Sequence, residues 1–322
     1  MLFRFLFNSR GAAAAAIFFG LISSASAQLN CPPDPLPPTS EQLQSWFRDA
    51  PERGFLWEIE KDGRKSWLFG TIHTAKPQWI GMGTKTMTAL RQANVIALEI
   101  NPLDHVTVAA MQSDMAAMVE ADKANPLPAA LQKRLTTTAQ NNCVIPQAIE
   151  SMPVVFTAIG AILNGARKDG LEPSFGIDVF IAGFAQGAKK PVLQLETVAT
   201  QMKLVRGLFG EDRNAGLSET LDLIDSGEAR TQIQKLAKVW ETTDHEMLRT
   251  YLQWCDCVKT EKEAQLMAQT NDARNPGMAD GIDAVHSQGR SVFAAVGALH
   301  FTGAKALQDL MAAKGYTVKV VK

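Results

Sequence analysis

The sequence predicts an α/β fold with a mixed central sheet flanked by helices. Short apolar runs of strand length alternate along the chain with longer stretches of helical length, which is the pattern of strands and crossover helices. A hydrophobic fraction of 46% and a charged fraction of 20% are typical of a chain that folds around a core and too apolar for intrinsic disorder. The elements follow in chain order.

The first predicted strands form a hairpin. Residues 55–60 and 66–72 are apolar and aromatic runs, and the loop between them contains Asp62-Gly63, which supplies the positive φ that hairpin loops need. Residues 95–100 form a continuous apolar run that ends at Asn101-Pro102, as expected of a strand buried on both faces. The remaining predicted strands are residues 192–195, 291–296 and 316–321.

Helices are predicted between these strands, at residues 105–122, 153–166, 176–187, 228–241 and 302–314. The block 210–273 is more charged and has Glu and Lys spaced for i,i+4 pairs, so we expect a helical insertion that covers one edge of the sheet. No linker rich in Pro, Gly or Ser separates this block. Residues 28–322 are therefore expected to form a single domain.

The first 27 residues are typical of a signal peptide. Arg4 and Arg10 give the N-terminal region a positive charge, and residues 11–22 form an apolar run after it. Ala25-Ser26-Ala27 provides small residues for cleavage after Ala27. The run is shorter than the ~20 apolar residues that a membrane span needs. We therefore expect a periplasmic or secreted protein with no membrane span after cleavage. A retained anchor is the alternative.

The charge balance bears on the partners. With 32 Lys+Arg against 33 Asp+Glu, the formal net charge is −1. No excess of positive charge is available to neutralise phosphates, so we expect no nucleic-acid partner.

Export changes how the four cysteines are interpreted, because thiols oxidise outside the cytosol. Cys255 and Cys257 are separated by one residue, and a bond between them is expected to be strained. Each is therefore predicted to pair with Cys31 or Cys143, in an order that the sequence leaves open. A Cys-x-Cys metal or redox site is the competing interpretation.

Four candidate functional side chains follow predicted strands. His73 and His300 each end a Gly-x-x-His motif just after a strand, and Glu99 and Glu196 each close an apolar strand. In α/β sheets, ligands bind outside the carboxyl ends of the strands, so these four side chains are expected in one cleft. A single Gly-x-x-His or strand-end Glu is common by chance, and the argument depends on the set of four.

Bringing two carboxylates and two imidazoles together is costly unless a cation or hydrogen bonds compensate them. A divalent metal ion of unknown identity, with imidazole and carboxylate ligands, would do so. The sequence has no Gly-x-Ser-x-Gly elbow, His-Glu-x-x-His helix or phosphate-binding Gly-rich loop. These absences argue against a serine hydrolase, a zincin and a nucleotide enzyme.

The chain also resembles the TraB/GumN proteins, which include the Tiki metalloproteases. The resemblance runs from residue 55 to the C-terminal strand. The blocks that carry it are Gly70-Thr71-Ile72-His73, Leu98-Glu99, Phe175-Gly176-Ile177-Asp178, Leu195-Glu196-Thr197 with Gln201, Arg274-Asn275, and residues 296–303 around Gly297-Ala298-Leu299-His300. It implies a fold related to erythromycin-esterase-like and ChaN-like proteins.

For function, the resemblance implies a metal-dependent peptidase site. Carried over by position, His73, His300 and Glu99 would be metal ligands, and Glu99 would be a ligand or a general base. Arg274 would suit an oxyanion role, with Glu196 as a further catalytic candidate. Asp178 and Asn275 are lesser candidates, since Asp178 stands at a predicted helix start where capping is equally expected.

Two functions are consistent with these residues. The first is an exported metal-dependent hydrolase acting on a peptide or other small polar substrate. The alternative is a non-catalytic periplasmic protein that binds haem, a metal or a polar ligand in the same cleft, or an accessory protein of envelope polysaccharide export.

Overall fold

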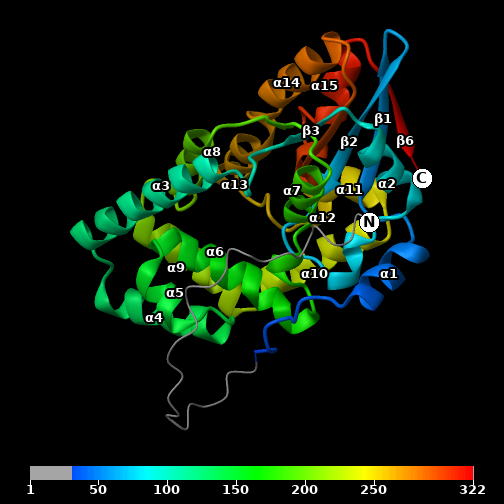
Figure 1. The fold of residues 1–322 in the computed structure, drawn as a ribbon. Helices are drawn as coiled ribbons and strands as arrows, with labels where there is room; N and C mark the ends of the chain where they lie inside the picture. The colour runs from blue at the N-terminus through cyan, green and yellow to red at the C-terminus, as the bar shows by residue number, and fades with distance from the viewer. Residues whose placement is uncertain (1–30, 322) are drawn as a thin grey trace.

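The computed structural model describes residues 31–321 (Figure 1). The predicted signal peptide, residues 1–27, and its cleavage after Ala27 lie outside the described residues. The strands are β1 (Phe55–Lys61), β2 (Arg64–Thr71), β3 (Val95–Leu98), β4 (Val192–Gln194), β5 (Val292–Gly297) and β6 (Thr317–Val321). The α-helices are α1 (Ser40–Arg48), α2 (Thr84–Gln92), α3 (His105–Ala124), α4 (Ala129–Asn141), α5 (Pro146–Ser151), α6 (Val154–Gly165), α7 (Ile177–Gly187), α8 (Val198–Arg206), α9 (Arg213–Asp225), α10 (Glu228–Glu241), α11 (His245–Arg249), α12 (Tyr251–Trp254), α13 (Glu261–Met267), α14 (Asn275–Ser287) and α15 (Leu307–Ala313).

The shorter helical turns also matter for the site. They are the 3₁₀ turns η2 (Pro77–Ile80), η3 (Ala166–Asp169), η4 (Pro173–Phe175) and η6 (Ala298–Phe301), together with the π-helical turn η5 (Ala268–Asp272). The predicted helix 302–314 therefore begins later, at Leu307, and the turn η6 occupies the residues directly after β5. Within residues 31–321, no helix combines the length and the apolar character that crossing a bilayer requires.

The six strands form one mixed sheet in the order β4-β3-β5-β2-β1-β6, which confirms the predicted α/β fold with a mixed sheet. Strands β4, β3, β5 and β2 run parallel to one another, and β1 is antiparallel to both of its neighbours. The carboxyl ends of the four parallel strands therefore lie along the same edge of the sheet. The candidate side chains follow these four ends.

The predicted hairpin is confirmed, with a tighter turn than the sequence suggested. Lys61 pairs with Arg64, so only Asp62 and Gly63 form the loop, with φ of 54° and 69°. Positive φ at both positions matches the right-handed twist of the flanking strands. On its other side β2 pairs in parallel with β5, where Thr71 lies opposite Gly297, so the two Gly-x-x-His motifs begin side by side with an offset of one residue.

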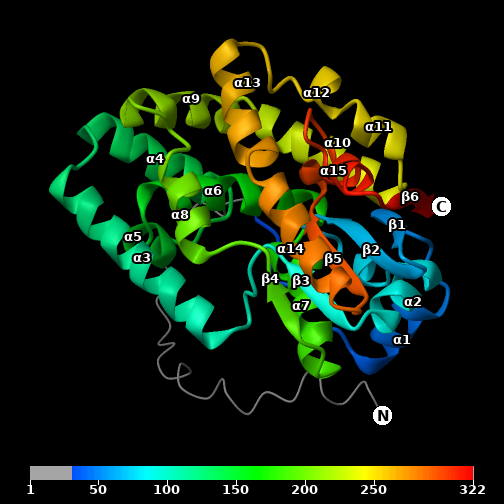
Figure 2. The same ribbon diagram turned by 90° about the horizontal axis from the view of Figure 1, so that it is seen from above.

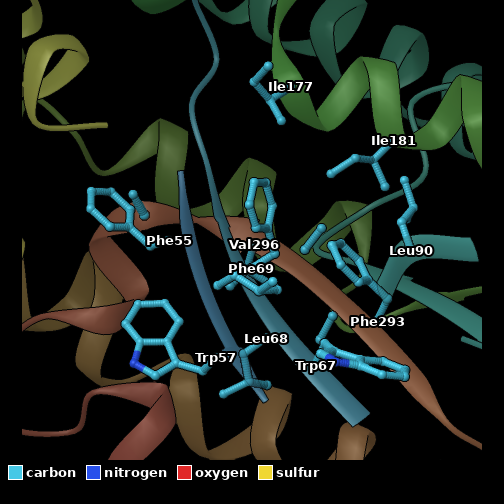
Figure 3. Packing of buried hydrophobic residues seen from close by; sticks show 14 of the residues in the cluster. Phe55, Trp57, Trp67, Leu68, Phe69, Leu90, Ile177, Ile181, Phe293 and Val296 are labelled. Carbon is cyan, nitrogen blue, oxygen red and sulfur yellow. The ribbon is translucent and has the colours of Figure 1, made fainter. Parts of the chain in front are cut away.

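The core covers both faces of the sheet (Figure 3). Trp67 of β2 is in register with Phe293 of β5, so both side chains lie on the same face, where Phe69 is 5.6 Å from Phe293 between ring centroids. On the other face, Trp57 of β1 stacks on Phe301 of η6, with centroids 4.3 Å apart. This packing fixes η6, the turn that carries His300.

A second apolar cluster lies in a group of helices beside the sheet. Figures 1 and 2 show α3, α4, α5 and α9 gathered on one side of the molecule, away from the strands. Buried apolar residues of α4, α6 and α9 form this cluster, with Leu135, Ala161 and Leu217 among them. The stretch 210–273 contains α9 to α13, and α9 packs with helices from earlier in the chain. The single-domain assignment stays a prediction.

The predicted cysteine pairing is wrong. Cys31 bonds Cys143 with Cα atoms 5.6 Å apart, and Cys255 bonds Cys257 with Cα atoms 5.0 Å apart. Both Cα separations lie in the usual range for disulfides. The pairing of Cys255 with Cys257 is possible because Asp256, between them, has a φ of 57° that turns the chain back on itself.

Candidate functional site

The residues after three parallel strands line one cavity of about 380 Å³. His73 follows β2, Glu99 follows β3 and His300 follows β5, and Arg274 at the start of α14 joins them. The rest of the lining is Thr71, Ile72, Thr74, Leu163, Ile233, Leu236, Ala237, Met267, Thr270, Asn271, Gly297, Ala298 and Leu299. The structure thus brings these four predicted residues together.

Glu196, the predicted site residue after the fourth parallel strand, β4, is not among the residues that line this cavity. The pairing of β3 with β4 continues past the strands, since Leu195 N donates to Leu98 O (2.8 Å) and Glu196 N donates to Glu99 O (2.9 Å). This backbone pairing places Glu196 beside Glu99. The side chain of Glu196 is only 5% exposed and reaches the site through Arg274.

Arg274 links the two carboxylates. Its Nε donates to Glu196 Oε1 (2.8 Å), and its Nη2 donates to Glu99 Oε2 (2.7 Å) and also to Glu196 Oε2. Its Nη1 donates to the carbonyl oxygen of Thr270 (2.8 Å). Gln201 of α8 donates from Nε2 to both carboxylates at 3.2 Å. A guanidinium and an amide thus bridge the two neighbouring carboxyl groups and offset the repulsion between them.

The carboxyl group of Glu99 is held in its ionised form. Burial by itself raises its pKa, but the hydrogen bond and charge of His300, followed by the charges of Arg274 and His73, outweigh burial and hold the pKa well below its usual range. The backbone N–H of Gly297 also donates to Glu99 Oε1 at 2.7 Å. A Cβ at position 297 would lie 3.3 Å from that oxygen, so glycine leaves room for this close approach.

His300 has a defined tautomer. The side-chain nitrogen of Asn275 donates to the carbonyl oxygens of His300 (2.9 Å) and Lys305 (2.7 Å), so its oxygen must face His300 Nδ1, 2.5 Å away. Nδ1 therefore carries a hydrogen and donates it to Asn275. In the neutral ring, Nε2 has the free lone pair, and it lies 3.6 Å from Glu99 Oε1. Nε2 is thus the ring nitrogen of His300 that faces the glutamate sharing its cavity.

His73 is oriented in a similar way by Asp178. Its Nδ1 lies 3.3 Å from Asp178 Oδ2, and the negative charge and hydrogen bond of Asp178 raise the pKa of His73 above its usual value. The side chain of His73 is 61% exposed, so solvent weakens the contribution of this ion pair to stability. Asp178 is thus more than a helix-start residue, because it orients a candidate ligand.

The donor set fits a divalent cation in part. Two ligands about 2.0–2.1 Å from one tetrahedral ion are about 3.4 Å apart, close to the 3.6 Å between His300 Nε2 and Glu99 Oε1. Both histidines also have Nδ1 held by an oxygen, the outer-shell arrangement that metal-ligating histidines use. Within residues 31–321, no group of three or more His, Cys, Asp or Glu side chains gathers closely enough to hold an ion.

Sequence reasoning underestimated the supporting residues. Gln201 and Asn275 belong to the family-like blocks. Gln201 was given no role and Asn275 was only a lesser candidate, although Gln201 bridges both glutamates and Asn275 sets the tautomer of His300. Their position next to Glu196 and Arg274 in those blocks was the available signal. A polar residue that is fully buried at a helix start, as Asn275 is, can be recognised only from the fold.

Thr71 provides a first prediction. It lines the cavity and is 2% exposed, and its Oγ1 has no hydrogen-bond partner among the described residues. A buried hydroxyl without a partner destabilises a fold, so Thr71→Val is expected to leave the free energy of unfolding unchanged or raise it by up to about 1 kcal/mol. Urea denaturation measures this change in the free energy of unfolding.

The matched control is Thr86→Val, which removes a hydrogen bond from Thr86 Oγ1 to Glu52 (2.9 Å) and is expected to cost about 1–2 kcal/mol of stability. Equal losses in both variants would contradict this prediction.

A second prediction concerns the contribution of Glu99 to folding stability at low pH. The pKa of Glu99 is lower in the folded chain than the ~4.3 of an unfolded one, so its ionised form stabilises the fold above about pH 4. This stabilisation is lost as the pH falls toward the folded-state pKa. Glu99→Gln is therefore expected to lose less stability than wild type between pH 4 and pH 2.5, measured by urea denaturation in chelator. Glu120→Gln, at an exposed pair with Lys123, should follow the wild-type slope, and a Glu99→Gln slope equal to wild type would contradict the prediction.

Comparison with known proteins gives one match. Residues 55–320 match the family model described as the TraB/PrgY/gumN family. Neither the curated proteins nor the solved structures give a match. The expected relation in fold to erythromycin-esterase-like and ChaN-like proteins stays a prediction.

Proposed function

This chain belongs to the TraB/PrgY/gumN family, and we propose that it is an exported hydrolase of a peptide or other acyl bond. The observation that supports this most is the arrangement at the strand ends: an ionised glutamate, an imidazole with a fixed tautomer and an arginine share one cavity. Hydrolysis needs a group that takes a proton from water and a group that stabilises negative charge on the attacked carbonyl. The cavity holds candidates for both.

Each residue has a proposed task. His300 Nε2 is the proton acceptor or a cation ligand, and Asn275 keeps its lone pair available. Glu99 stays ionised beside it and stabilises the imidazolium that forms when His300 takes a proton. Arg274 orients Glu99 and Glu196 with its Nε and Nη2 hydrogens. Among the described residues one Nη1 hydrogen has no acceptor, and because Arg274 lines the cavity this N–H is the candidate for stabilising the developing negative charge.

We further propose that the site takes a divalent cation, with His300 and Glu99 as ligands. His73 lines the same cavity but does not lie close enough to them in this structure, and it would be drawn in as the third ligand on binding. When bound, such a cation would polarise the substrate carbonyl and lower the pKa of water. The support is the donor chemistry: two imidazoles with oxygen-anchored Nδ1 atoms, and one carboxylate oxygen at a ligand-like separation from His300.

Export to the periplasm or the medium is part of the proposal. The two disulfides support it, because such bonds persist in oxidising compartments. Mass spectrometry of the protein recovered from the producing cells is expected to find Gln28 as the mature N-terminus. A cytosolic protein that keeps residues 1–27 would contradict export.

The test of the function uses chelator-treated protein, to which Mn²⁺, Zn²⁺ or Co²⁺ is returned, and a library of peptides and esters. We expect cation binding in calorimetry and hydrolysis of at least one library member, with both lost in His73→Ala and both kept in the matched control His105→Ala. His105 is exposed at the start of α3 and does not line the cavity. Hydrolysis that persists in the presence of chelator would contradict the proposed cation but would still support the proposed hydrolase activity. Uptake of a metal or of haem without hydrolysis under any condition would overturn the hydrolase in favour of a binding protein.

A further inference from the structure

The cavity has two chemically different sides. Its polar side is formed by the residues at the strand ends, and its apolar side is formed by helices that lie outside the sheet. Leu163 of α6, Ile233 and Leu236 of α10, and Met267 of α13 line this apolar side. All four are half-buried, so part of each apolar side chain is uncovered where they gather. We call these four residues the apolar wall.

The charges on the polar side are already paired. Arg274 makes its hydrogen bonds with Glu99, Glu196 and a backbone carbonyl, and both oxygens of Glu99 accept hydrogen bonds. His73 is likewise paired, with Asp178. A charged substrate group that packs against the apolar wall would therefore find no partner of opposite sign there, because the wall side chains themselves are uncharged. Burying a charge without a partner costs far more than burying an apolar group gains.

The remaining charge of the site lies away from the wall. Glu99 and Glu196 carry one negative charge more than Arg274 neutralises, and this excess is located at the strand ends beside His300. In the protein without the proposed cation, an anionic substrate group would be repelled there. The proposed cation and the scissile bond are expected at the strand ends. Because the strand ends and the apolar wall line one cavity, a substrate group next to that bond is expected to face the wall.

The volume limits the size of that group. About 380 Å³ is near the lower end of the ~300–1,000 Å³ that ligand pockets have. One or two residues, or an acyl group of similar size, fit this space.

We propose that the cavity selects substrates with an uncharged apolar group, aliphatic or aromatic, next to the scissile acyl bond, and that the apolar wall makes this selection. This inference rests on the proposed hydrolase function, because it names the substrate class of the same site. The wall comes from α6, α10 and α13, so substrate selection belongs to the helical layer and not to the strand ends that carry the reacting groups.

The test compares two pairs of ligands whose side chains differ mainly in charge. N-acetyl-norleucinamide and N-acetyl-lysinamide have side chains of similar length, and N-acetyl-glutaminamide and N-acetyl-glutamate amide form a second pair. Calorimetry with chelator-treated wild-type protein is expected to show norleucine binding at least about tenfold tighter than lysine, with glutamate weakest. Lysine or glutamate binding as tightly as norleucine, or no binding by any of the four, would overturn the inference.

Variants of the wall test its part in the selection. Leu236→Glu places a carboxylate in the wall, so it is expected to weaken norleucine binding about tenfold and to strengthen lysine binding. Leu223→Glu is the matched control, because Leu223 is 46% exposed on α9 and does not line the cavity. Its ligand preference should equal that of wild type. Ile233→Lys, expected to favour glutamate, provides the same test if Leu236→Glu does not fold, and an unchanged preference in a folded wall variant would contradict the inference.

The two proposals fail in different ways. Selective binding of norleucine with no hydrolysis of any library member would overturn the hydrolase and support the selective cavity. Hydrolysis of the peptide library without preference for apolar residues next to the cleaved bond would support the hydrolase and overturn the selective cavity.

Discussion

His300→Ala is expected to lower kcat/KM for the best library substrate by about 10²–10⁴-fold, the range that a positioned general acid–base group contributes. The reason is that Asn275 accepts the hydrogen of Nδ1, so Nε2 is the nitrogen of the neutral ring that can take a proton. Nε2 lies 3.6 Å from Glu99 Oε1. Steady-state kinetics on the substrate found by the library screen measures the effect.

Two further variants separate chemistry from folding in this experiment. His105→Ala changes an exposed histidine outside the cavity and is expected to keep wild-type kcat/KM. Asn275→Asp keeps an acceptor for Nδ1 but replaces the donor to the carbonyl oxygens of His300 and Lys305 with a second acceptor, so it is expected to alter the pH profile of kcat/KM and also to lower the melting temperature. If His300→Ala retained more than about a tenth of wild-type kcat/KM while folded, His300 would have no part in the chemistry.

Arg274→Met is expected to have the largest effect on stability, a loss of about 3–5 kcal/mol in the free energy of unfolding. The arginine side chain is 13% exposed and bridges two carboxylates whose side chains are 16% and 5% exposed. Methionine keeps the apolar stem but leaves two neighbouring buried carboxylates without their cation. Urea denaturation at pH 7 measures the loss.

The control and the rescue make this second prediction specific. Arg134 also bridges two carboxylates, Asp222 and Asp225, but at the surface, so Arg134→Met is expected to cost no more than about 1 kcal/mol. Adding Glu196→Gln to Arg274→Met removes one of the unpaired charges and is expected to recover part of the stability. A cost for Arg274→Met similar to that for Arg134→Met would show that the bridge at Glu99 and Glu196 does not stabilise the fold.

Some features of the fold and the candidate site could be predicted from the sequence and others could not. The hairpin at Asp62-Gly63 and the apolar run that begins at Val95 are predictable, because turn chemistry and strand periodicity are local properties of the chain. The convergence of His73, Glu99 and His300 was also predicted, because the ends of parallel strands meet at one edge of the sheet. The pairing of Cys255 with Cys257 was not, because it depends on the backbone conformation of a single residue, Asp256.

By itself, the sequence determined the fold class, the family and which side chains gather at the ends of the parallel strands, since these follow from short-range patterns and from motif order. Only the tertiary structure decided that Arg274 and Gln201 bridge the two glutamates, that Asn275 sets the tautomer of His300, and that helices from the other layer form the apolar wall. These contacts join residues from different elements, some nearly two hundred positions apart, such as Glu99 and Gly297. Their existence depends on packing and on hydrogen-bond geometry, which no local pattern of the chain encodes.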